Sequence, residues 1–218
     1  MKFQTLLGAA FGTLFAGSVG AVTLDFDGGV GITQTPDGPV YVQDGVTFGL
    51  SSSGGDGPAL FNSDCGNSCN GDADLKPAIQ GENGVAGNVL IQQNPNETNP
   101  NDDPNTLFLT ITLLSDVQLI WTGVSLIDDG FYVASTSLDT FLDDATLTGE
   151  SETEELSFTS SVLGEGDSVT VSFFTTKGKA GASGAIDNLT FAPVPLPASA
   201  LLLLGALGGM AAMRRRKA

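Results

Sequence analysis

Apolar and polar residues alternate along most of the middle of the chain. In segment 107–113, Leu107, Leu109, Ile111 and Leu113 occupy every second position, and the apolar residues of segment 169–173 do the same. A period of two is typical of a strand that buries one face and exposes the other. Shorter runs of the same kind predict further strands at 22–26, 39–42, 46–50, 88–91, 117–121, 124–127, 131–134, 156–159 and 185–191.

Glycine-containing turn signals such as Asp44-Gly45 separate these runs, and no amphipathic helix of ordinary length interrupts them. Many short strands joined by polar turns predict an all-β fold. We expect an antiparallel β-sandwich of the jelly-roll type that forms a single domain over 22–193. Two polar stretches, 51–85 and 92–106, are predicted as long loops, which in a compact domain are usually functional or mobile.

The N-terminal segment has the parts of a secretory signal peptide. Lys2 precedes an apolar, helix-forming run at 3–15, and small residues follow as far as Ala21. A positive first region, an apolar core and a small-residue cleavage site define such a leader. We therefore expect a signal helix at 1–21 and a mature chain that starts at Val22. An uncleaved anchor is the alternative, although the run is short for a span of roughly 20 residues.

The C-terminal segment, 194–218, combines three parts. A short motif comes first, and an uncharged apolar stretch at about 196–213 follows it. This stretch is just long enough for a single transmembrane helix across a bilayer core of about 30 Å. Basic residues remain on the cytoplasmic side, which leaves the acidic middle of the chain outside. The motif is Val194, Pro195, Leu196, Pro197 and Ala198, and the basic tail is Arg214, Arg215, Arg216 and Lys217.

Charge narrows the range of functions. The chain has 25 acidic residues, eight basic residues and no histidine. Segment 22–194 holds all 25 acidic residues, three lysines and no arginine, a net charge of −22. Without histidine, the chain can form neither Ser-His or Cys-His nucleophile pairs nor imidazole metal sites. The negative field repels nucleic acid and other polyanions, so neutral sugars, divalent cations and polycations remain as partners.

The C-terminal segment resembles the PEP-CTERM sorting signal, in the variant named after its VPLPA motif. The motif matches 194–198 letter for letter, and the short span and basic cluster follow in the same order. In that family an exosortase, a membrane cysteine protease, recognises the tail in Gram-negative bacteria that make exopolysaccharide. The resemblance implies an inner-membrane precursor with a cytoplasmic C-terminus, cleavage near Pro197-Ala198, and a mature domain on the cell surface or in the extracellular matrix. A plain membrane anchor is the alternative.

The middle of the chain is similar to ectodomains that recur among PEP-CTERM proteins. The similarity rests on the order of several short motifs, from LDFD at 24–27 to AIDNLTF at 185–191. The closing motif also resembles the last strand of jelly-roll carbohydrate-binding modules, in which a structural calcium often joins the first and last strands. The resemblance implies calcium ligands among Asp25, Asp27 and Asp187, with Asp72 and Asp74 as a second cluster. The alternative is that these aspartates form turns and caps or a solvated acidic face.

Cys65 and Cys69 are the only cysteines of a chain expected in an oxidising compartment, so a local disulfide is predicted. A zinc or iron-sulfur site would need about four ligands, which two thiolates without histidine cannot supply. The three residues between them also differ from the two-residue spacing usual in redox-active pairs. Calcium is therefore the only cofactor that the sequence suggests.

Two aromatic residues, Trp121 and Tyr132, are candidates for stacking on a sugar ring. Because Trp121 ends an apolar run, packing in the core is the alternative. The composition and the sorting signal together favour a non-catalytic binding or structural component associated with exopolysaccharide. A secreted, carboxylate-dependent polysaccharide hydrolase and a calcium-stabilised adhesin are the alternatives. The expected processing partners are signal peptidase and the exosortase.

Overall fold

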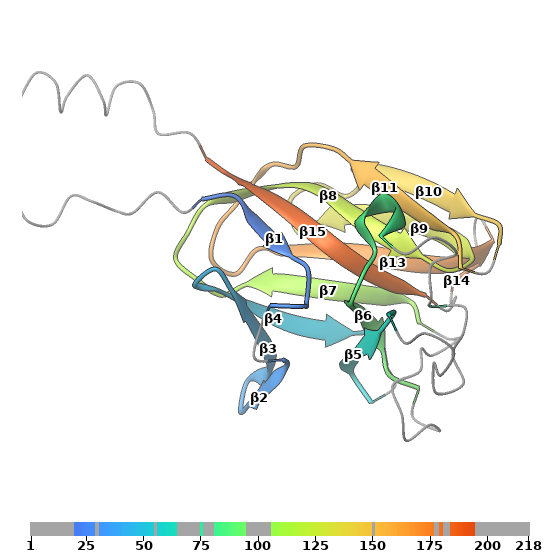
Figure 1. Ribbon diagram of the computed structural model, residues 1–218. Helices are drawn as coiled ribbons and strands as arrows, with labels where there is room; N and C mark the ends of the chain where they lie inside the picture. The colour runs from blue at the N-terminus through green and yellow to red at the C-terminus, as the bar shows by residue number, and fades with distance from the viewer. Residues whose placement is uncertain are drawn as a thin grey trace, which may run out of the picture.

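The computed structural model describes the middle of the chain (Figure 1). Its described residues are 20–28, 31–54, 56–64, 75, 81–94, 106–149, 151–176, 179–180 and 184–194. Residues 1–19 and 195–218 lie outside this set, and of the predicted sorting motif only Val194 belongs to it. The predicted disulfide and second aspartate cluster, at 65–74, also lie outside it. Among the described residues, no helix has the length and apolarity needed to cross a membrane.

The prediction of an all-β fold is confirmed, since the described part of the chain contains strands and one short 3-10 turn, η1 (Glu82–Gly84). The strands are β1 (Val22–Leu24), β2 (Thr33–Thr35), β3 (Gly38–Gln43), β4 (Val46–Ser52), β5 (Pro58–Asn62), β6 (Asn88–Gln92), β7 (Phe108–Leu113), β8 (Leu119–Ile127), β9 (Gly130–Thr136), β10 (Asp143–Leu147), β11 (Thr153–Ser157), β12 (Val162–Leu163), β13 (Ser168–Thr176), β14 (Lys179–Ala180) and β15 (Ala185–Pro193).

The strands form two antiparallel sheets, the arrangement of a β-sandwich (Figure 1). The seven-stranded sheet has the order β11-β8-β15-β6-β5, with β1 paired to β15 and β12 paired to β8. The eight-stranded sheet has the order β10-β9-β13-β7-β4-β3-β2, with β14 paired to β13. In the register of β1 and β15, Val22 lies opposite Phe191 and Leu24 opposite Leu189. The first and last strands of the domain are therefore direct neighbours.

The main core lies between the sheets and follows the alternation seen in the sequence. In β7, Leu109, Ile111 and Leu113 are buried, while the threonines between them belong to the outer face. Leu107, predicted for the same buried row, precedes β7 and is 43% exposed. Apolar burial of this kind stabilises the fold by about 25 cal/mol for each Å² removed from water.

Segment 51–85, predicted as one loop, instead provides a cover for the outer face of the seven-stranded sheet. It contributes β5 and η1, and its Phe61, Leu75 and Val85 form a second buried cluster with residues of β6 that include Ile91. Strand β6 is buried on both faces because the main core packs on its other side. The sequence did not indicate this cover, since period-two alternation identifies strands with one exposed face.

Strand β8 joins two runs, 117–121 and 124–127, that the sequence predicted as separate strands. Gly123 between them is not a turn: it lies inside β8, where a Cβ would come within 2.7 Å of the Leu156 carbonyl oxygen of β11. A glycine inside a strand often marks such a close approach of a neighbouring backbone. The sequence also missed β2, β10, β12 and β14, which are short or carry exposed polar residues.

Candidate functional site

The pairing of the first and last strands brings the predicted calcium ligands into one region. Asp25 and Asp27 follow directly after β1, and Asp187 lies in β15. Between the first two, Phe26 is buried and has a positive φ of 55°, which turns the chain sharply at this point. We call Asp25, Asp27 and Asp187 the carboxylate cluster.

Polar groups from three segments hold the first two carboxylates. Oδ1 of Asp25 accepts hydrogen bonds from the backbone N–H of Asp27 at 3.1 Å and from Nε2 of Gln43, at the end of β3, at 2.9 Å. Oδ1 of Asp27 accepts the backbone N–H of Asn88, at the start of β6, at 2.6 Å. Gly87, with a φ of 65°, lets Asp27 approach, since a Cβ there would overlap this carboxylate. The cluster thus links β1, β3 and β6.

Asp187 is fully buried beneath the segment that precedes β6. Its Oδ1 accepts the backbone N–H of Asn188 at 2.7 Å, and its Oδ2 accepts Nδ2 of Asn188 at 3.0 Å and the backbone N–H of Ala86 at 3.4 Å. Asn188 also donates to the Gly84 carbonyl oxygen. Burial raises the pKa of the Asp187 carboxyl to about 8, and the negative charges of Asp27 and Asp25 add to this rise.

The donor set suits a hard cation such as calcium, which takes carboxylate and amide oxygens as ligands. Besides the carboxylates, the site offers Oε1 of Gln43, a buried oxygen with no hydrogen-bond partner in the described structure. A buried acceptor of this kind is costly unless something satisfies it. No three Asp, Glu, Cys or His side chains of the described ranges converge closely enough to hold a metal ion. The types of ligand atom therefore fit calcium. The three carboxylates, however, do not lie close enough together to surround a metal ion.

Gln43 and Asn88 contribute to this site. The sequence marked Asn88 only as part of a predicted strand and its motif, and it did not mark Gln43. Both residues are polar positions at strand ends, where the local pattern gives no hint of a partner. Their role depends on β3 and β6 coming close to the turn after β1, which the sequence alone does not show.

The two aromatic candidates for sugar stacking belong to the core, as the alternative for Trp121 anticipated. The Trp121 and Tyr132 side chains are both fully buried, so neither ring presents a face to a ligand. Nε1 of Trp121 donates to the Gly123 carbonyl oxygen at 2.9 Å, and the Tyr132 hydroxyl donates to the Asp128 carbonyl oxygen at 3.0 Å. We correct the stacking prediction accordingly: burial and internal hydrogen bonds satisfy both side chains.

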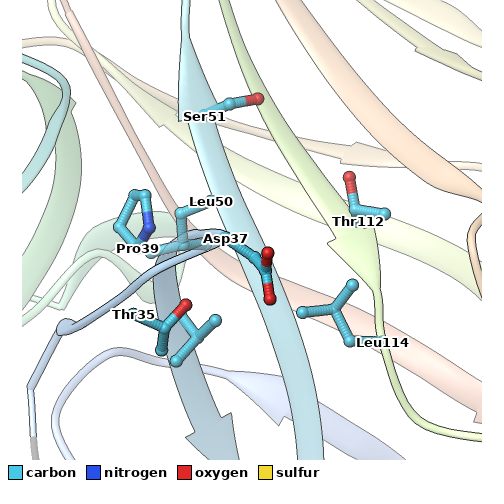
Figure 2. A pocket seen from close by; sticks show the side chains of 9 residues that line it. Thr35, Asp37, Pro39, Leu50, Ser51, Thr112 and Leu114 are labelled. Atoms are coloured by element: carbon cyan, nitrogen blue, oxygen red, sulfur yellow. The ribbon is translucent and has the colours of Figure 1, made fainter.

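A groove with a volume of about 360 Å³ lies on the outer face of the eight-stranded sheet (Figure 2). Figure 2 shows Asp37 and Pro39 of the β2–β3 hairpin on one side, and Thr112 and Leu114 of the β7 region on the other, with the Asp37 carboxylate directed toward Leu114. The sequence marked Asp37 only as part of a turn and Pro39 only as part of a strand, and it predicted no site at any of these residues. A polar and apolar mixture in a hollow of this size is typical of small-molecule sites.

No protein-family model matches the chain, and the comparison with curated proteins found no match.

Proposed function

We propose that the chain is an exported, exosortase-sorted protein of the cell surface or extracellular matrix of a Gram-negative bacterium. In this proposal its middle is a jelly-roll-like sandwich, acting as a non-catalytic binding or structural component associated with exopolysaccharide. The observation that carries the proposal is where the sandwich begins and ends. Strand β1 begins at Val22, directly after the predicted leader, and β15 ends at Pro193, directly before the predicted sorting motif.

The pairing of these two strands supports the same proposal. Because β1 and β15 are neighbours, both predicted targeting segments leave the domain from one place, and either could be removed without cutting a strand. The jelly-roll assignment is supported by the path of the chain, which passes repeatedly from one sheet to the other between β1 and β15. Frequent crossing between two sheets is a feature of jelly rolls.

Processing of the tail tests the proposal. Replacing both Pro195 and Pro197 with alanine, or deleting 214–217, should leave the protein in the inner membrane with its tail uncleaved. Mass spectrometry of the wild-type exported form should show a chain that begins at Val22 and lacks the apolar tail. Pro193→Ala is the matched control, because it changes a proline at the end of β15 outside the motif and should be processed normally. Normal release of the Pro195/Pro197 variant would contradict the sorting role.

Calcium binding at the carboxylate cluster is a second proposed property, favoured by the buried Oε1 of Gln43. Asp25, Asp27 and Gln43 would hold the ion, with Asp187 beside them. When bound, calcium would supply positive charge and extra bonds that tie the turn after β1 to β3 and β6. This role is structural, which agrees with an adhesin or matrix protein rather than a catalyst.

A carboxylate-dependent hydrolase finds less support at this site. Glycoside hydrolysis uses one carboxyl with a raised pKa and a second carboxylate, both in contact with the substrate. Asp187 has the raised pKa, but its side chain is fully buried and bonded to Asn188 and Ala86. We therefore propose a non-catalytic role, and release of soluble sugar from a polysaccharide by the exported protein would overturn it.

A further inference from the structure

The groove on the outer face of the eight-stranded sheet has a floor and two walls of different chemistry. Its floor is formed by Gly49 and Ser51 of β4 and Thr112 of β7, and Gly49 lies directly opposite Thr112 in the strand register. In β4 the residues of the outer face alternate with buried Val46, Phe48 and Leu50, so a side chain at position 49 would point into the groove.

The walls rise on either side of this floor. One wall is the β2–β3 hairpin, which contributes Thr35, Asp37 and Pro39. The hydroxyl of Thr35 donates to the Gly38 carbonyl oxygen at 2.7 Å, which braces the turn that carries Asp37. The other wall is Leu114, an apolar side chain that is 42% exposed. The hairpin side therefore combines polar Thr35 and Asp37 with apolar Pro39 and Val40, whereas the side of Leu114 is apolar (Figure 2).

The charges of the lining select the class of ligand. The lining contains one carboxylate, Asp37, and no lysine or arginine. An anionic ligand would meet this carboxylate with no cation to pair with it, within a segment of net charge −22. A single carboxylate with hydroxyls is also too few oxygen ligands for calcium, which takes six to eight. A neutral molecule that carries both hydroxyls and an apolar face fits this lining best.

A row of hydroxyls continues from the groove across the sheet. Ser51 lies opposite Thr110, Thr110 opposite Thr170, and Thr170 opposite Ser135, so the row crosses four strands. The Oγ1 atoms of Thr110 and Thr170 are 3.0 Å apart and share a hydrogen bond. Neighbouring strands are about 4.8 Å apart, so the row offers hydroxyl groups at regular intervals beyond the groove.

We propose that this groove binds a neutral hexopyranose unit of a polysaccharide, with the adjoining units of the polymer lying along the hydroxyl row. The inference rests on the proposed association with exopolysaccharide and assigns it to one site. Asp37, Ser51 and Thr112 hydrogen-bond the sugar hydroxyls, and Leu114 contacts the apolar face of the ring. A volume of about 360 Å³ is near the lower end of the usual range of roughly 300–1,000 Å³, which suits one ring rather than an enclosed oligosaccharide.

Binding of defined oligosaccharides to the full chain in mild detergent tests this assignment. The probes are cellohexaose and mannohexaose as neutral hexose chains and hexagalacturonate as an anionic chain, measured by isothermal titration calorimetry. We expect at least one neutral probe to bind and hexagalacturonate not to bind. Preference for hexagalacturonate would overturn the ligand class.

Two groove variants and one control locate the site. Gly49→Val fills the floor, where a Cβ would already lie 3.3 Å from Cδ1 of Leu114, and should weaken binding at least tenfold. Asp37→Asn keeps the turn but removes the charged acceptor, and should weaken binding several-fold. Thr146→Val, on β10 at the far edge of the same sheet, should bind as the wild type does. Circular dichroism checks that each variant folds. If Gly49→Val does not fold, Asp37→Asn still tests the site.

The outcomes separate this inference from the proposed function. If the wild type binds a neutral probe and both groove variants bind it equally well, the groove assignment is overturned while association with polysaccharide stands. If the wild type binds none of the probes, the groove assignment is overturned together with the polysaccharide part of the proposed function. The role of the tail in sorting is tested independently by the processing variants.

Discussion

Asp187 illustrates how one residue takes its properties from segments far away in the sequence. Its place in the run 185–191 predicted a strand, and alternation with buried Ile186 put its side chain on the outer face of the seven-stranded sheet. An aspartate on an outer face would ordinarily be solvated. Here the segment before β6 covers it, so that burial and the neighbouring Asp27 and Asp25 raise the pKa of its carboxyl to about 8.

This raised pKa makes stability depend on pH. An exposed Asp has a pKa near 3.9, so between about pH 4 and pH 8 the unfolded chain releases a proton that the folded chain keeps. Stability is therefore greatest at the acid end of this window and falls as the pH rises toward 8, by at most about 1.4 kcal/mol per pH unit from this group. Urea denaturation of the protein in chelator, at pH 5 and pH 7.5, should show this loss.

Asp187→Asn is the variant that isolates the effect, because its side chain stays neutral at every pH. We expect the loss of stability between pH 5 and pH 7.5 to become smaller in Asp187→Asn than in the wild type. Glu152→Gln is the control and should keep the pH dependence of the wild type. Glu152 is exposed, and backbone N–H groups of Thr148 and Gly149 lower the pKa of its carboxyl, so it stays charged over this pH range. An equal pH dependence of stability in the wild type and in Asp187→Asn would contradict the raised pKa of the Asp187 carboxyl.

At the scale of elements, the cover formed by segment 51–85 buries side chains on the outer face of the seven-stranded sheet. Its strand β5 pairs with β6, and Phe61, Leu75 and Val85 close over the sheet. The same segment continues into η1 and the residues that bury Asp187, so the second apolar cluster and the carboxylate cluster share one support. An apolar contact in the cover therefore helps to hold the polar site in place.

Truncation of Phe61 tests the importance of this cover. Phe61 is 3% exposed, and Phe61→Ala should lower the free energy of unfolding by about 3 kcal/mol, the usual cost of emptying a buried aromatic site. Phe141→Ala is the matched control: Phe141 is 57% exposed, and its loss should change stability by no more than about 0.5 kcal/mol. Guanidinium denaturation of both variants provides the comparison, and similar values for the two would show that the cover contributes little.

At the scale of the whole molecule, the sandwich is closed by the pairing of β1 with β15. The carboxylate cluster lies at the end of this pairing and contacts β3 and β6 as well, so it connects both sheets at the point where the domain begins and ends. Asp25 and Asp27 place negative charge near Asp187 in this strongly acidic segment, and their repulsion adds to the rise in the pKa of the Asp187 carboxyl. A bound divalent cation would relieve this repulsion and stabilise the whole fold.

Calcium is therefore expected to raise the melting temperature of the protein. At free calcium about 100-fold above the dissociation constant, ligand binding stabilises a fold by about 2.7 kcal/mol, which corresponds to roughly 5–10 °C for a domain of this size. Differential scanning calorimetry in calcium and in chelator gives the shift. Asp25→Asn combined with Asp27→Asn should remove it, whereas Asp143→Asn combined with Asp144→Asn, on β10, should not. An unchanged melting temperature in chelator would rule out a structural calcium.

The sequence by itself determined the class of fold and most of its strands. Alternation is a local property, so the buried rows of β7 and β13 and the strands on either side of the Asp44-Gly45 turn could be predicted without knowing what they pack against. Absent residue types are equally local, and they limited the chemistry before any contact was known.

Only the tertiary structure decided which surfaces are covered and which are open. Trp121 and Tyr132 differ from ligand-binding aromatics only through the layers that bury them, and Gln43 reaches Asp25 only because β3 comes close to the turn after β1. The groove likewise requires the β2–β3 hairpin to stand beside β4 and β7. Burial, pKa and hollow surfaces are produced by segments distant in the chain, and a pattern read along one segment does not contain the neighbour that creates them.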